Sequence, residues 1–230
     1  MSQRCERAYK KHLEDWFKYI SYNSDIQEKC DLVAGLARNV YSKLKACADD
    51  NWSINIEPQW QIPISNDDNF RRSACYLLVG GKIEVKDYII KFYTFTLSVV
   101  TNRRIVRRFH FDIDTGGNAQ RKSVMKPKCH IQYGGEAYEL RFNPTLKYTL
   151  ASWIEKPRFP FPPIDIVLLL DFTLSQINTS LGHKFVDEHY WKKLVRESEK
   201  LRLKEYYDQI HQHLGNFSSE KRTLFEKLCG

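Results

Sequence analysis

The hydrophobic pattern of this chain changes its period twice, and this change limits the folds that are open to it. Between residues 4 and 48, apolar side chains recur every three or four positions, as on one face of an amphipathic helix. From Trp52 onward they alternate with polar side chains, which is the pattern of a half-buried β-strand. After Pro160 the helical period returns. The order helices, strands, helices predicts an α+β fold.

The β-prone region divides into consecutive segments that are separated by turn residues. We expect strands at 52–56, 74–79, 83–100, 104–114 and 128–133, a short one at 137–142, and a turn at Gly80-Gly81. Short turns join antiparallel neighbours, so the sequence predicts an antiparallel meander of five or six strands. An N-terminal helical hairpin and the C-terminal helices are expected to pack on one face of it, with helices at 4–20, 24–48, 164–177 and 186–214.

The chain has 230 residues, of which 42% are hydrophobic, and this excludes a disordered protein. We expect a single core domain at 1–180 and a C-terminal helical arm at 181–230. No apolar run approaches the length of a membrane span, and the first residues lack the apolar core of a secretory signal. The six cysteines are scattered without a CxxC pair, which is typical of reduced thiols. The sequence therefore predicts a cytoplasmic protein that does not contact a membrane.

The positive charge is concentrated in one segment. The chain has a formal net charge of +8, and residues 102–160 alone carry twelve basic and five acidic side chains. Such a concentration attracts polyanions, although a solvated hairpin tip is an equally good interpretation, and no known nucleic-acid-binding motif accompanies it. The candidate nucleic-acid-binding residues are Arg103, Arg104, Arg107, Arg108, Arg121, Lys122, Lys126 and Lys128.

Two neighbouring expected strands carry histidines at alternating positions. Alternation places His110 and Asp112 on one face of their strand, and it places His130 and Gln132 on one face of the next. If the strands pair with their apolar faces in the core, these four side chains meet. Two imidazoles and a carboxylate suit a divalent metal or acid–base work on a phosphodiester, so His110, Asp112 and His130 are the candidate catalytic residues. The alternative is a hydrogen-bonded network that fixes strand register.

Four polar residues are expected to have structural roles: Gln132, Arg158, Asp165 and Asp171. Asp165 lies near the start of an apolar helix, where an acid interacts favourably with the helix dipole. Asp171 lies inside that helix, where an unpaired carboxylate is unfavourable. We therefore expect a basic partner for Asp171, either Arg158 or one of the arginines at 103–108.

Three blocks of sequence carry a resemblance: FHFDID at 109–114, PKCHIQYGG at 127–135 and RFPFPPIDIVLLLDFTLSQ at 158–176. In combination they resemble a poorly characterised bacterial family that is encoded in mobile-element and phage-defence neighbourhoods. The resemblance implies a cytoplasmic accessory or effector component that works beside partner proteins. It supplies no catalytic residues to transfer, and the basic loop at 116–128 is longer here than that pattern leads us to expect.

Two main functions follow from these patterns. The first is an accessory, non-enzymatic subunit of a bacterial anti-phage defence complex, which binds a partner protein and uses its basic surface for DNA or RNA. No cofactor is expected in that case. The second is a nuclease or RNase-type effector that uses His110, Asp112 and His130, and only this function calls for a divalent metal. A toxin-like or antitoxin-like partner with vestigial acid–base residues is a third alternative. We expect the first function.

Overall fold

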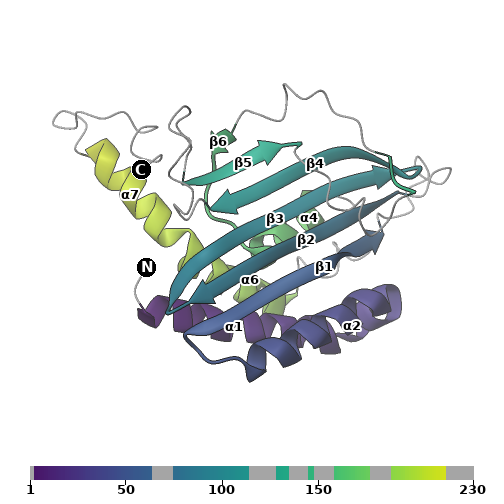
Figure 1. The fold of residues 1–230 in the computed structure, drawn as a ribbon, viewed down its shortest axis with the longest axis horizontal. Helices are drawn as coiled ribbons and strands as arrows, with labels where there is room; N and C mark the ends of the chain where they lie inside the picture. Colours follow the sequence, from purple (N-terminus) through teal and green to yellow (C-terminus); the bar gives the residue numbers. More distant parts are fainter. Residues whose placement is uncertain are drawn as a thin grey trace.

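The computed structural model describes residues 3–63, 75–113, 128–134, 145–147, 158–176 and 188–215. Its helices are α1 (Gln3–Tyr22), α2 (Ser24–Ala46), α4 (Ile166–Gln176), α6 (His189–Arg202) and α7 (Lys204–Gly215). Its strands are β1 (Asn51–Pro63), β2 (Cys75–Lys86), β3 (Ile89–Thr101), β4 (Arg104–Ile113), β5 (Cys129–Tyr133) and β6 (Arg158–Pro160). The fold is α+β, as predicted, and in chain order the strands follow the first two helices and precede the last three described ones (Figure 1).

The six strands form one sheet in the order β1-β2-β3-β4-β5-β6, and every neighbouring pair is antiparallel. The predicted meander is therefore confirmed. Two of its connections are two-residue turns, Asp87-Tyr88 and Asn102-Arg103, in which all four residues have φ between 48° and 60°. Tight hairpins of type I′ require this conformation. The strand predicted at 137–142 lies outside the described residues, and β6 was not predicted.

The predicted turn at Gly80-Gly81 is wrong, because both glycines lie inside β2. The single strand predicted at 83–100 is also wrong, because the turn at Asp87-Tyr88 divides it between β2 and β3. Gly81 pairs with Phe95 of β3, whose ring occupies the space that a side chain at position 81 would need. A Cβ atom at Gly81 would lie 2.2 Å from Cδ1 of Phe95. Here the glycine allows close packing in a strand rather than a turn.

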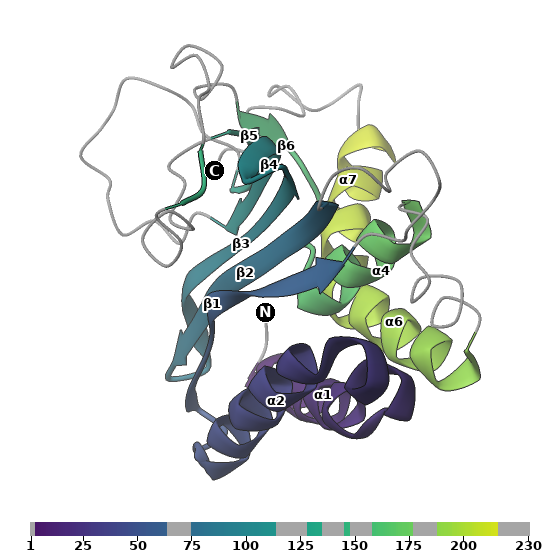
Figure 2. The same ribbon diagram turned by 90° about the vertical axis from the view of Figure 1, so that its right-hand side faces the viewer.

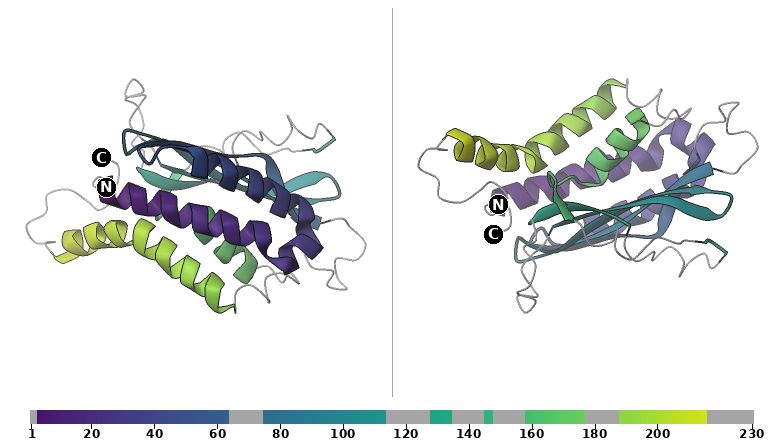
Figure 3. Two further views of the ribbon diagram at one scale, coloured as in Figure 1. Left: turned by 90° about the horizontal axis from the view of Figure 1, so that it is seen from below. Right: turned by 90° about the horizontal axis from the view of Figure 1, so that it is seen from above.

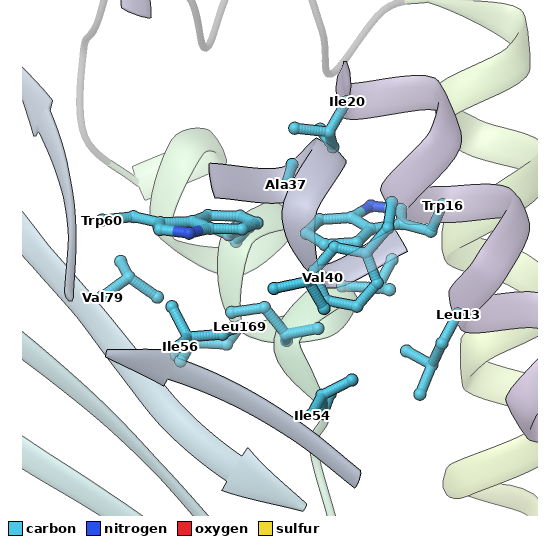
Figure 4. Close-up of a cluster of buried hydrophobic side chains, with 14 of the residues drawn as sticks. Leu13, Trp16, Ile20, Ala37, Val40, Ile54, Ile56, Trp60, Val79 and Leu169 are labelled. Atoms are coloured by element: carbon cyan, nitrogen blue, oxygen red, sulfur yellow. The ribbon is translucent and has the colours of Figure 1, made fainter. Parts of the chain in front are cut away.

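The helices cover one face of the sheet, and the main core lies between the two layers (Figures 2 and 3). Trp16 of α1 stacks on Trp60 of β1, with ring centroids 5.8 Å apart and an interplanar angle of 14°. Trp191 of α6 lies 6.4 Å from Trp16. Figure 4 shows the stacked pair, with Val40 of α2 and Leu169 of α4 among the neighbouring side chains. These large rings bring the N-terminal helices, the sheet and α6 into a single core.

The helix predicted over 186–214 is two helices that meet at Leu203. The first, α6, buries Trp191 in the main core, so it belongs to the core rather than to the predicted arm. The second, α7, has His213 as its buried side chain and is otherwise largely exposed. The predicted boundary between residues 180 and 181 lies outside the described residues. Within the described ranges, no helix is long and apolar enough to cross a bilayer.

Candidate functional site

The register of β4 and β5 brings the predicted polar residues together on the face of the sheet opposite the helices. Asp112 pairs with His130, and His110 pairs with Gln132. Directly paired residues point to the same face, so the prediction that the two imidazoles share one face is confirmed. The pairing continues onto β3 and β6. We call the combined set the outer polar network: Thr94, Thr96, Ser98, Arg108, His110, Asp112, His130, Gln132 and Arg158.

Arg108 and His110 form the buried centre of this network, with exposed fractions of 1% and 8%. The Arg108 guanidinium donates a hydrogen bond to Nε2 of His110, and another over 3.0 Å to the carbonyl oxygen of Gly134. Because a guanidinium only donates, Nε2 of His110 accepts, and the proton of the neutral ring is on Nδ1. Burial, together with the positive charges of Arg108, His130 and Arg158, lowers the pKa of His110 to about 3.

Asp112 connects three strands at the edge of the network. Its Oδ1 accepts a hydrogen bond from the hydroxyl of Thr94 on β3. Its Oδ2 lies 3.6 Å from Nε2 of His130 on β5. The Asp112 side chain is 27% exposed, whereas that of His130 is buried. The carboxylate is therefore the member of this pair that solvent reaches.

These contacts limit the chemistry that the network can perform. A histidine acts as a general base or a metal ligand through a free lone pair, and the lone pair of neutral His110 is directed at Arg108. Among the residues that the structure describes, no three His, Cys, Asp or Glu side chains are grouped so that they could hold a metal ion. The geometry fits a hydrogen-bonded network that fixes the register of β3, β4 and β5.

The lowered pKa of His110 makes the fold sensitive to acid. An unfolded histidine titrates near pH 6.5, whereas the folded pKa is about 3, so the unfolded state binds one more proton between these values. Stability is expected to fall as the pH falls from 6.5 to 3, by up to about 1.4 kcal/mol per pH unit from this residue. His110→Gln keeps an acceptor for Arg108, and its urea unfolding curves are expected to lose this contribution. An unchanged slope would contradict the assignment. His211→Gln is the control, because it also removes one imidazole, but from an exposed position.

One predicted nucleic-acid-binding residue is not on the surface. Arg108 is buried and donates to His110 and Gly134, so its assignment to a nucleic-acid surface is wrong. The sequence already indicated that Arg108 lies beside His110, because the two residues are two positions apart and therefore share a strand face. The arginine therefore belongs with the histidine, not with its exposed neighbours.

The exposed members of the predicted basic set lie at opposite ends of β4. Lys128 is exposed next to Cys129, which pairs with Ile113 at the end of β4. Figure 1 shows the other end, where β3 turns into β4. This end carries exposed Arg103, Arg104 and Arg107. A strand of ten residues spans about 30 Å, so the two groups are separate. Outside the described residues lie Arg121, Lys122 and Lys126.

The two aspartates of the apolar helix have different partners. Asp165 caps α4, because its Oδ1 accepts the backbone N–H of Leu168 over 3.0 Å. It also accepts a hydrogen bond from the hydroxyl of Ser198. The predicted role of Asp165 as an acid at the helix N-terminus is confirmed. Asp171 accepts the indole N–H of Trp191 over 2.7 Å, so the prediction of an arginine partner is wrong.

Lys147 is a basic residue that sequence analysis missed. It forms an isolated parallel bridge with Arg104. Its N–H donates over 2.8 Å to the carbonyl oxygen of Arg103, and its own carbonyl accepts the N–H of Ile105 over 2.9 Å. These bonds place an exposed lysine beside the exposed arginines. Its local sequence gives no sign of this contact, which joins segments more than forty residues apart.

Arg202 is a second buried arginine that sequence analysis missed. Its guanidinium carbon lies 4.7 Å from the ring centroid of Tyr9 and 5.2 Å from that of Tyr93. Burial raises the pKa of both tyrosines. Burial also raises the pKa of Glu6, and the positive charge of Arg202 partly offsets this effect. In the sequence, Arg202 is one cation among many in a charged helix.

Comparison of this chain with protein-family models, with curated proteins and with solved structures gave no match.

Proposed function

We propose that this chain is an accessory, non-enzymatic subunit of a bacterial anti-phage defence complex, and that it binds a partner protein and nucleic acid. The observation that carries the non-enzymatic part is the hydrogen bond from Arg108 to Nε2 of His110. It occupies the lone pair that a general base would use. Both residues are buried, so a substrate would have to displace Arg108 to reach His110.

The defence assignment is supported by the resemblance of the three sequence blocks. The described parts of these blocks form β4, β5, β6 and α4. They supply much of the outer polar network and the helix that packs on the opposite face of the sheet. The described parts of the three blocks therefore form part of the core of the fold rather than a reactive surface. This is what we expect of a subunit that works beside other proteins.

A surface for the partner protein is supported by α7. This helix exposes Tyr207 and Leu214, with exposed fractions of 52% and 56%. Together with the half-buried Leu203 and Ile210, they follow the spacing of one helical stripe. A stripe of this kind favours contact with another apolar surface. The proposed partner-binding surface is therefore confined to α7, because α6 packs in the core.

The proposal is tested on the full chain, tagged and expressed in its native host. We expect a partner protein to co-purify, and we expect Tyr207→Ser/Leu214→Ser to lose it. Gln209→Ala/His211→Ala, at exposed polar positions of the same helix, is expected to keep it. The purified chain is expected to leave labelled DNA and RNA uncut with Mg²⁺ or Mn²⁺. Cleavage that disappears in His130→Ala and persists in Cys129→Ala would overturn the proposal in favour of the nuclease.

A further inference from the structure

We infer that the end of the sheet where β3 turns into β4 binds the phosphodiester backbone of nucleic acid. This inference rests on the proposed binding function and specifies where nucleic acid would bind. The residues concerned, which we call the arginine tip, are Arg103, Arg104, Arg107 and Lys147. All four side chains are exposed, and none of them forms an ion pair with another residue of the described chain.

Backbone pairing gathers three of these side chains on one face. Arg104 pairs with Thr101 of β3, and Arg107 pairs with Val99. The register shifts between Val99 and Val100, where β4 carries one extra residue, so Arg104 and Arg107 face β3 partners that are only two residues apart. The two arginines therefore share a face, at a spacing of about 7 Å along β3. Lys147 pairs directly with Arg104 and is held there by two backbone hydrogen bonds. Backbone pairing therefore places three cations side by side.

Within the described residues, this arrangement places like charges together without an acidic neighbour. Like charges directly opposite each other on neighbouring strands repel, and Arg104 and Lys147 form such a pair. Arg103 occupies the second position of the hairpin turn with φ of 60°. Glycine is preferred there, because a Cβ atom is crowded in the left-handed conformation. A bound polyanion removes the repulsion, and it gives the Arg103 side chain a role that glycine could not fill.

Phosphodiester is the anion that this set fits best. Three of the four residues are arginines, whose planar guanidinium forks match phosphate oxygens in pairs. Nucleic acid also presents phosphates in a dense row, and each contact gains free energy from counterion release. Attachment to an anionic bilayer combines cations with an inserted apolar face. The exposed apolar residue within this stretch of β4 is Val106 alone among those described, which is too little for insertion.

The test measures binding of the full chain to a fluorescein-labelled 24-base-pair DNA duplex, and to an RNA duplex of the same sequence, by anisotropy. Four phosphate contacts give a slope of about −3.6 in log affinity against log salt, a roughly hundredfold loss between 50 and 200 mM. Arg103→Gln/Arg104→Gln/Arg107→Gln leaves one contact, so the slope is expected to be about −0.9 and the loss about threefold to fourfold. Lys18→Gln/Lys43→Gln/Lys86→Gln removes the same charge at exposed positions elsewhere and is expected to keep the wild-type slope.

Binding of either duplex with these slopes supports the inference, and the tighter duplex identifies DNA or RNA as the ligand. Equal slopes in the two triple variants would overturn it. Equally tight binding of polyglutamate or phosphatidylserine vesicles would also overturn it, in favour of an acidic protein or a membrane. Lys147→Gln gives an independent check, because it should raise the Tm of the free chain and reduce the Tm increase caused by the duplex. If neither duplex binds, the inference fails together with the nucleic-acid part of the proposed function. Partner co-purification and the absence of cleavage test the remainder of the proposed function independently.

Discussion

Replacing Arg202 with methionine is expected to lower the free energy of unfolding by about 3–5 kcal/mol, the usual effect of removing one member of a buried charged group. The guanidinium is buried between α1, α6 and the sheet, and it lies over the rings of Tyr9 and Tyr93. It is also the positive charge that offsets the burial of the Glu6 carboxyl. Methionine fills a similar volume but leaves that carboxyl without its compensating charge.

Urea unfolding at pH 7 measures this effect. Arg196→Met removes an exposed arginine of the same helix and is expected to change stability by no more than about 0.5 kcal/mol. Adding Glu6→Gln to Arg202→Met is expected to recover part of the loss, because the two residues interact and their effects are not additive. A loss below about 1 kcal/mol for Arg202→Met, on the scale of an exposed ion pair, would contradict a structural role for its charge.

Gly81→Ala is expected to destabilise the protein by about 3 kcal/mol, at the upper end of the range for overpacked cores. The new Cβ would lie 2.2 Å from Cδ1 of Phe95 and 2.6 Å from the carbonyl oxygen of Thr94. The second of these atoms belongs to the backbone of β3, so relief requires the two strands to separate.

The matched control is Gly35→Ala in α2, where an added Cβ meets no atom within 4 Å. That substitution is expected to stabilise the protein by about 1 kcal/mol, because glycine is a poor helix former. Thermal and urea unfolding of the two variants should therefore move in opposite directions. A stability of Gly81→Ala equal to the wild type would show that Phe95 and β3 adjust freely, contrary to the packing described above.

The features that the sequence predicted correctly depend on short-range periodicity. The switch from a helical to a two-residue period gave the α+β class, and consecutive strands gave the meander. The features that it missed depend on tertiary packing. The local pattern of two glycines at 80 and 81 is typical of a turn. Only the tertiary contact between Phe95 and Gly81 explains why they lie in a strand. The break at Leu203 follows a buried arginine that no local pattern marks.

The features of the candidate site also fall into those that local periodicity predicts and those that depend on tertiary contacts. Alternation correctly placed His110 and His130 on one face, because a strand has a fixed two-residue repeat. The same rule applied to Arg108 would have joined it to His110, yet its place in a basic run suggested a surface role. Lys147 and the indole partner of Asp171 required knowledge of contacts between distant segments. Local pattern reports which way a side chain points, but not what it meets there.

The neighbour-to-neighbour order of the strands also has a consequence for folding during synthesis. Each hairpin can close soon after its second strand emerges from the ribosome, since local contacts form quickly and with little loss of loop entropy. The contact between Trp16 and Trp191 is different, because it joins residues 175 positions apart (191 − 16). At roughly 5–20 residues per second, Trp191 follows Trp60 by about 7–26 seconds. During that interval the stacked indoles of the nascent chain lack their third ring, and this is the period in which a chaperone would protect them from aggregation.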